Sequence, residues 1–214
     1  GYTTVAGGKA TGNIVNAGGS TVTNVVGGQS DGDATENTVN VTGGNVTNVT
    51  GGVSTTGAAS KNTINLGAVN IAGNVTGGQG VTTTDNKINV EGTTVAGSIT
   101  GGSAGGTGHV LTVKGANTAG SITGFGKLKF DVGTATSNPM LTLNGGASNL
   151  DWGTLEATGT TAGPITLMNN SAGISFGSTY DGAISSIDSD DTTEFNIDTE
   201  NRLATSERVI AQSY

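Results

Sequence analysis

The sequence predicts an all-β fold: a single-stranded, right-handed parallel β-helix with rungs of about 24 residues and a C-terminal cap. Three observations lead to this prediction. Similar segments recur at a near-constant interval through residues 1–132, polar and apolar residues alternate inside each segment, and glycine occupies 39 of the 214 positions. A fixed period in this range indicates a stack of like units, each too small to bury a core alone.

The repeat is clearest in four segments that begin with asparagine and carry a second asparagine three positions later. The central apolar residue of each segment advances by 24, 25 and 24 residues, and a further step of 23 reaches Leu111. Equivalent residues of stacked rungs lie above one another at the strand spacing of ~4.8 Å, so we expect two asparagine ladders. The corner ladder comprises Asn13, Asn37, Asn62 and Asn86, and the outward ladder comprises Asn16, Asn40, Asn65 and Asn89.

Alternation within these segments separates an interior face from an exterior face, because successive side chains of a strand point to opposite sides. The residues that share the interior phase are expected to be almost fully buried. They are Val39, Val41, Ile64, Leu66, Ile88, Val90, Leu111 and Val113.

The rest of each unit is a short turn, a second strand and a loop. The second strand is predicted to open five positions after the first ends, at Val22, Val46, Ile71, Val95 and Thr118. The last three of these strands are one residue longer and contain Ala-Gly, which predicts a bulge in each. A glycine then leads into loops 27–37, 51–62, 77–86 and 101–109. We expect these loops to be exposed and variable, so shortening residues 54–59 is expected to spare folding.

Beyond residue 132 the repeat loosens, and we divide the chain accordingly. Residues 133–180 are predicted to form irregular rungs, and residues 181–214 an acidic cap or junction that holds eight of the sixteen acidic residues. An open solenoid end needs protection from further strand addition. The aromatic residues just before and within this region suit that role; they are Phe125, Phe130, Trp152, Phe176, Tyr180 and Phe195. Residues 205–212 fit either a short helix or a final strand.

Two other readings of the chain are weaker. Low aliphatic content is typical of disorder, yet a disordered chain has no reason to keep its apolar residues in phase. An antiparallel sandwich would not require identical side chains at identical offsets. The handedness is predicted from a single observation. Left-handed solenoids usually show strict hexapeptide repeats, and none occurs here, which favours right-handed rungs.

With these residues in view, the chain resembles the passenger repeats of large Gram-negative autotransporter adhesins. The resemblance rests on residues 43–52 (GGNVTNVTGG) and 32–41 (GDATENTVNV), and on 120–130 (GSITGFGKLKF) followed by 140–143 (MLTL). It implies a β-helix displayed outside the cell at the bacterial surface, which promotes adhesion or self-association. Its partners would be a cell-surface glycan or protein, of host or bacterium, or a second copy. The translocator barrel of a complete member is not part of this chain, which implies a fragment of the passenger.

Candidate catalytic and metal-binding residues are few, and we assign no catalytic, cofactor-binding or metal site. Residues 101–105 match the G-x-S-x-G pattern at Ser103, but the nucleophile elbow requires a following helix, and Gly-rich sequence follows instead. His109, the one histidine, is expected to replace asparagine in the corner ladder. Asp31, Asp33 and Glu36 have spacing that suits calcium, but the later loops do not repeat these acids. The acidic group Asp188, Asp190, Asp191 and Glu194 is expected to be solvated.

Two functional readings remain open. The first is a non-catalytic surface module for adhesion or self-association. The second is a carbohydrate-active β-helix enzyme, of the lyase or hydrolase type, which would need grouped acids on one face. Ice binding would need flat threonine rows, whereas the threonines are expected to shift between rungs. No basic cluster suggests nucleic-acid binding, and no apolar run suggests membrane insertion of this fragment.

Overall fold

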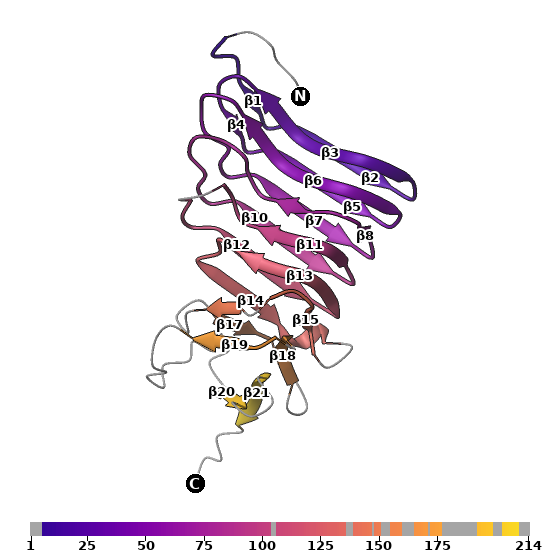
Figure 1. Ribbon diagram of the computed structural model, residues 1–214, viewed down its shortest axis with the longest axis vertical. Coiled ribbons are helices and arrows are strands. Elements are labelled where there is room, and N and C mark those ends of the chain that lie inside the picture. The colour runs from indigo at the N-terminus through magenta and orange to yellow at the C-terminus, as the bar shows by residue number, and fades with distance from the viewer. Residues whose placement is uncertain are drawn as a thin grey trace.

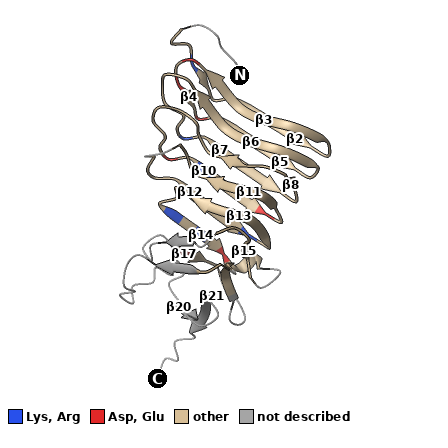
Figure 2. Cartoon of the chain, in the orientation of Figure 1, with Lys and Arg blue, Asp and Glu red and all other residues tan. Residues whose placement is uncertain are grey.

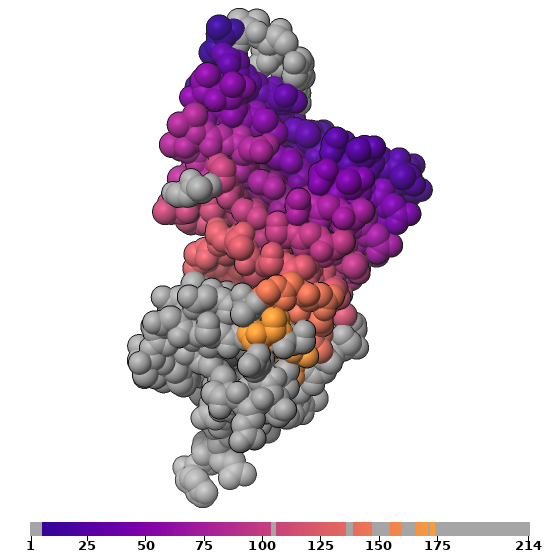
Figure 3. Space-filling view, viewed as in Figure 1, coloured from indigo at the N-terminus to yellow at the C-terminus, as the bar shows by residue number. Residues whose placement is uncertain are grey.

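The computed structural model describes residues 6–103, 106–135, 139–146, 148–150, 155–159, 165–170, 172–176, 192–198 and 203–209. These residues form an elongated stack of parallel strands, with successive rungs following one another along the long axis (Figures 1 and 3). The described residues contain no α-helix, and one 3₁₀ turn spans Val132–Thr134. The predicted parallel β-solenoid with rungs of about 24 residues is therefore confirmed. The right-handed sense stays a prediction.

One side of the stack is a seven-stranded parallel sheet in which each neighbour comes from the next rung. The strands in sequence order are β2 (Ile14–Gly18), β5 (Thr38–Thr42), β7 (Thr63–Gly67), β10 (Lys87–Glu91), β12 (Val110–Lys114), β14 (Lys127–Asp131) and β17 (Leu155–Thr158). The register pairs Val15 with Val39, Val39 with Ile64, Ile64 with Ile88 and Ile88 with Leu111, which confirms the predicted steps.

The second side is a ten-stranded sheet, parallel as far as β18. Its strands are β3 (Thr21–Ser30), β6 (Asn45–Ser54), β8 (Asn70–Ile71), β9 (Val75–Thr76), β11 (Thr94–Thr100), β13 (Asn117–Thr123), β15 (Leu141–Leu143), β18 (Ile165–Asn170), β20 (Thr192–Asp198) and β21 (Leu203–Val209). Strands β8 and β9 are two pieces of one rung, and both pair with β6 and β11.

The prediction of exposed loops is wrong in part. The first residues of loops 27–37 and 51–62 belong to β3 and β6, and the rest of the predicted loop segments form the third side. Strands β1 (Ala10–Thr11) and β4 (Ala34–Thr35) pair in parallel there, and Ala58 bridges to Thr82 in the next rung. Ala34 and Ala59 are fully buried, so this side also contributes inward side chains. The loops are exposed at their tips and ordered at their bases, because their backbone groups bond from rung to rung.

The interior is a set of vertical aliphatic stacks, as predicted. None of the eight residues expected to be inward is more than 2% exposed. Leu128 and Leu155 extend one stack, and Phe130 extends its neighbour. Phe130 therefore packs in the core, where we had expected a capping aromatic. Each such burial stabilises the fold by ~1.5–3 kcal/mol before entropy losses, so the stacks supply the main driving force.

Paired glycines at one corner have a steric reason that the sequence pattern alone did not show. A Cβ at Gly51 would overlap the Gly77 carbonyl oxygen and lie 2.8 Å from Cβ of Asn62, and a Cβ at Gly52 would lie 2.7 Å from Nδ2 of Asn62. The same geometry recurs at the other levels of this corner. The Gly-Gly step thus makes room for the buried corner side chain of each of these rungs, which is Asn37, Asn62, Asn86 or His109.

The fifth rung departs from the predicted offsets. Ala119 pairs with Val95 and is fully buried, whereas Thr118, the expected opening residue, pairs with Thr94. The extra residue of this rung therefore lies in the turn before β13. The Ala-Gly insertion lengthens only the strands that open at Ile71 and Val95. The bulge predicted for a third strand is wrong.

The same rung is also short, because only three residues separate β13 from β14, and its loop side is missing. Farther along, β21 pairs antiparallel with both β18 and β20, so the parallel stacking stops there. Residues 203–209 are a strand, so the strand alternative holds for residues 205–209, and residues 210–212 lie outside the described residues. Strands β16 (Ser148–Leu150) and β19 (Ile174–Phe176) form a separate parallel pair.

Seven strand levels are described on the first side. Whether residues 181–214 act as a cap stays a prediction. Trp152 and Tyr180, two of the expected capping aromatics, lie outside the described residues.

Candidate functional site

The corner ladder is buried and serves structure. Asn62 accepts hydrogen bonds at Oδ1 from the backbone N–H of Asn37 and from its Nδ2, each at 3.0 Å, and donates from Nδ2 to the Ala34 carbonyl at 3.0 Å. Asn86 takes the same role toward Asn62 one rung later. Among the described residues, every buried side-chain nitrogen and oxygen has a hydrogen-bond partner. The ladder therefore leaves no polar group in the core free for a ligand.

His109 completes this ladder, as the sequence predicted. Its Nδ1 accepts the backbone N–H of Asn86 at 3.1 Å, and its Nε2 lies 3.4 Å from the Thr83 hydroxyl oxygen. An Nδ1 that accepts a hydrogen bond carries no proton, so the neutral ring is protonated at Nε2. Burial lowers the pKa of His109 below its ordinary value, and the charge of Asp85 opposes that shift.

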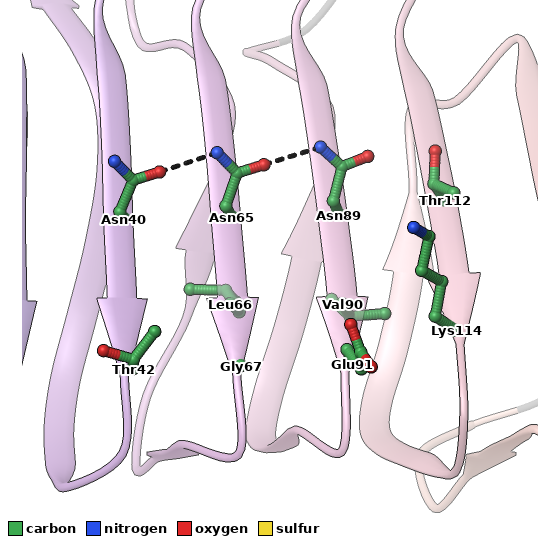
Figure 4. Close-up of a pocket in the computed structure, with 10 residues that line it drawn as sticks. All are labelled: Asn40, Thr42, Asn65, Leu66, Gly67, Asn89, Val90, Glu91, Thr112 and Lys114. Carbon is green, nitrogen blue, oxygen red and sulfur yellow. Dashed lines mark hydrogen bonds between the residues drawn. The ribbon is translucent and has the colours of Figure 1, made fainter. Parts of the chain in front are cut away.

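The outward ladder runs along the exterior of the first sheet. Nδ2 of Asn40 donates to Oδ1 of Asn16 at 2.8 Å, and the bonds from Asn65 to Asn40 and from Asn89 to Asn65 are each 2.7 Å. All three bonds have the same direction, with the donor in the later rung. The ladder therefore presents a row of oriented amides to solvent on β2, β5, β7 and β10, of which Figure 4 shows Asn40, Asn65 and Asn89.

A groove of about 570 Å³ lies beside this ladder. One wall is formed by Asn40, Asn65 and Asn89, and the opposite row is Thr42, Gly67, Glu91 and Lys114 on successive strands. Gly67 has no side chain, so a gap opens between Thr42 and Glu91 (Figure 4). A hollow with several convergent polar groups on a rigid sheet is the feature expected of a binding site.

The groove contains one acidic and one basic residue on adjacent strands. Glu91 and Lys114 are register partners, yet neither takes part in any of the three salt bridges formed by the described residues. By contrast, strands β3, β6, β11 and β13 of the second sheet carry no charged residue, as Figure 2 shows. The two faces of the solenoid therefore differ in charge.

The outward row ends in an ion cluster. Glu156, which continues the row past Lys129, is 4% exposed and lies 2.8 Å from Nζ of Lys127 and 3.3 Å from Nζ of Lys129. Burial raises the pKa of the Glu156 carboxyl, but hydrogen bonds and charge from the two lysines lower it by more, so the net pKa is below its ordinary value. The Glu156 carboxylate is therefore engaged in structural ion pairs with the two lysines.

The second sheet holds two rows that the sequence analysis missed. Asn48 donates to Oδ1 of Asn24 at 3.1 Å and accepts at Oδ1 from the backbone of Asn74 at 3.0 Å, which makes a third ladder. The expectation that threonines shift between rungs is wrong for one row of this sheet, whose members stand in register. They are Thr50, Thr76, Thr100 and Thr123. Two members of this row, Thr100 and Thr123, line a smaller hollow near the end of the loop side.

A smaller hollow of about 280 Å³ brings Ser103 and His109 together where the loop side ends. Their hydrogen bonds point elsewhere: the Ser103 hydroxyl donates to the Gly80 carbonyl at 2.8 Å, and both His109 nitrogens face the partners given above. The geometry therefore offers no base to activate this serine, which general-base catalysis would require.

Two of the three candidate calcium ligands, Asp31 and Asp33, are engaged in other contacts. Asp33 forms a salt bridge of 2.8 Å with Lys9 and accepts the backbone N–H of Ala58, and both contacts lower its pKa. Asp31 accepts the backbone N–H of Gly7 at 3.2 Å. In the described part of the chain, no group of three or more His, Asp or Glu side chains could hold a metal ion. Of the acidic group near residue 190, no side chain is described.

Comparison with known proteins adds nothing to this geometry: no family model, curated protein or solved structure matches the chain significantly. Within the part of the chain that the structure describes, no helix is long and apolar enough to cross a membrane.

The outward asparagines were predicted from sequence, but the groove was not. Its signal was present in the residue after each inward pair: reading down that position gives glycine, threonine, glycine, glutamate and lysine. The glycine at 67 between two larger residues marks the gap. That reading requires the exact vertical register, which the structure supplies.

Proposed function

We propose that this chain is a non-catalytic surface module that mediates adhesion or self-association through the exterior of its first sheet. The observation that carries the proposal is the outward asparagine ladder with its adjoining groove, held on a rigid stack. Rigid display of repeated hydrogen-bonding groups favours recognition of a partner that is itself repetitive, such as a glycan chain or a second copy. The resemblance to autotransporter passengers supports the same role and an extracellular location at the bacterial surface.

The alternative, a carbohydrate-active enzyme, is less well supported. Glycoside hydrolysis ordinarily uses two carboxyl groups that flank the scissile bond. The groove is lined by a single carboxylate, that of Glu91, and Lys114 is its one other ionisable group. The ordered amides suit binding better than proton transfer, because an amide side chain does not titrate in the physiological range.

The proposal is tested by light scattering over a dilution series and by binding of the labelled chain to bacterial and host cells. Asn65→Lys places a long charged side chain on the outward ladder, and Asn74→Lys makes the same change on the second sheet as a matched control. We expect Asn65→Lys to weaken association or cell binding and Asn74→Lys to leave both unchanged. A chain that is monomeric at high concentration and binds no cell would refute the proposal. Polysaccharide cleavage abolished by Glu91→Gln would establish the alternative.

A further inference from the structure

We propose that the groove beside the outward ladder binds an extended, electrically neutral oligosaccharide, which lies across β5, β7, β10 and β12 with one sugar unit per strand level. The inference rests on the proposed adhesive function and deepens it by naming the chemical class of the ligand. Three features of the groove support it: its repeated hydrogen-bonding capacity, its balanced charge and its shape.

The hydrogen-bonding capacity follows from the ladder geometry. A side-chain amide has two N–H donors and two acceptor lone pairs. Within the ladder, Asn40 and Asn65 each use one N–H and one lone pair, so one donor and one acceptor per residue remain for a ligand. These free groups repeat at the strand spacing of ~4.8 Å. Sugar hydroxyls both donate and accept, and an extended chain of β-linked pyranoses repeats at a similar distance.

The direction of the ladder adds a strong acceptor at its end. Each amide donates toward the N-terminal rungs, so Oδ1 of Asn89 is the last oxygen of the chain and accepts no bond from the next rung. Aligned hydrogen bonds polarise one another, which strengthens the terminal acceptor. Thr112, the register partner of Asn89, is also part of the groove lining. A ligand hydroxyl that donates to Asn89 would therefore extend the ladder.

The charge of the groove matches a neutral ligand. Glu91 accepts hydrogen bonds from hydroxyl groups, Lys114 donates to ring or hydroxyl oxygens, and their formal charges cancel. An acidic glycan would be repelled by Glu91, and a cationic one by Lys114. A neutral polyhydroxylated chain uses both groups without repulsion.

The shape of the groove fixes the orientation of the ligand. The lining residues come from four consecutive strands, so the groove crosses three strand spacings, ~14 Å in all. The gap at Gly67 makes the groove deeper near the centre of that span. A Cβ at Gly67 would meet only the Thr42 methyl at 3.7 Å, an ordinary contact, so a side chain there fills the groove without straining the fold.

The test is titration calorimetry of the whole chain with β-1,4-glucan oligomers, with oligogalacturonate as the acidic comparator and chitosan oligomers as the cationic comparator. We expect binding of the glucan series, with affinity that rises from dimer to tetramer and then levels off, because four strands line the groove. Gly67→Thr should weaken binding at least about tenfold, as expected when contacts at the centre are blocked. Thr63→Val, on the same strand but outside the groove, should bind normally, and thermal melting should show both variants folded.

Three results would overturn the inference: no binding of any neutral oligomer, preference for a charged comparator, or undiminished binding by folded Gly67→Thr. Glu91→Gln provides a second test, because it replaces a charged carboxylate acceptor with a weaker neutral amide acceptor. The change should weaken binding of a neutral glycan and strengthen binding of an acidic one. If glucan binding is absent while the chain still self-associates, the ligand class is wrong and the proposed function stands. If glucan binds but neither self-association nor cell binding occurs, the ligand class is right and the proposed adhesive function is wrong.

Discussion

Two alanine substitutions, Asn62→Ala and Asn65→Ala, make the same change on the inner and outer sides of one solenoid wall. Both residues belong to ladders with the same period and lie three positions apart. Asn62 is 0% exposed, whereas Asn65 is half-buried on the exterior. The pair therefore isolates the effect of burial on an asparagine ladder.

The magnitude follows from the bonds that each side chain makes. Asn62→Ala removes two hydrogen bonds donated by Asn37 and two donated by Nδ2 of Asn62, to Ala34 and Asn86. The Asn37 backbone N–H and the Ala34 carbonyl then lie in the core without the side chain that bonded them, at ~1–3 kcal/mol for each unsatisfied group. With the cavity left by the side chain, we expect a loss of ~4–6 kcal/mol in the free energy of unfolding. In Asn65→Ala, water can bond the groups that Asn65 leaves without a partner, so the loss in the free energy of unfolding should be about 1 kcal/mol or less.

The assay is urea-induced unfolding followed by far-UV circular dichroism, with fits of the midpoint and slope for each variant. A loss of this size is a large fraction of the ~5–15 kcal/mol stability of a typical domain, so Asn62→Ala should unfold at a much lower urea concentration. Equal costs for the two variants would refute the reasoning, because they would mean that burial of the corner ladder contributes nothing.

Four other changes test different parts of the structure. His109→Asn should remove a pH-dependent part of the stability. Because the pKa of His109 is lowered in the folded chain, its contribution is complete above the ordinary pKa of ~6.5 and is lost as pH falls below that value. The urea midpoints measured at pH 8 and pH 5 should therefore lie closer together in the variant than in the original chain. Ile64→Asp should prevent folding, seen as loss of the β-sheet signal, because it buries an unpaired charge. Gly51→Ala should cost ~1–3 kcal/mol or more by overpacking against Gly77, measured by thermal melting. Deletion of residues 54–59 should destabilise the chain, contrary to the expectation for a free loop, and proteolysis rates would report this.

Much of the fold was predictable because a solenoid translates sequence period directly into space. Once Val39, Ile64 and Ile88 are known to be equivalent, stacking at one strand spacing places every residue between them, inward or outward by alternation. The same logic correctly placed both asparagine ladders and put His109 in line with Asn86. Each of these predictions needed only local alternation and the step between rungs.

The prediction failed where the step itself changed. The rung from Leu111 to Leu128 is short, and its strand, with Leu128 and Phe130 facing inward, lacks the asparagine signature that marks the others. The shift of the register partner of Val95 from Thr118 to Ala119 has a related cause, since a turn can absorb one residue without leaving a mark in the alternation pattern. The repeat period averages over many rungs, so the position of one inserted residue becomes visible only when the strands of neighbouring rungs are paired residue by residue.

The sequence by itself determined the all-β class, the period, the identity of the buried residues and the existence of two ladders, because these follow from repetition and alternation. Only the tertiary structure showed why glycines are paired beside Asn62, that the loop side buries Ala34 and Ala59, and that Gly67 opens a groove between Thr42 and Glu91. Each of these features arises from contacts between residues a whole rung or more apart. Their distances depend on the register and curvature of neighbouring rungs, which no single unit of the sequence specifies.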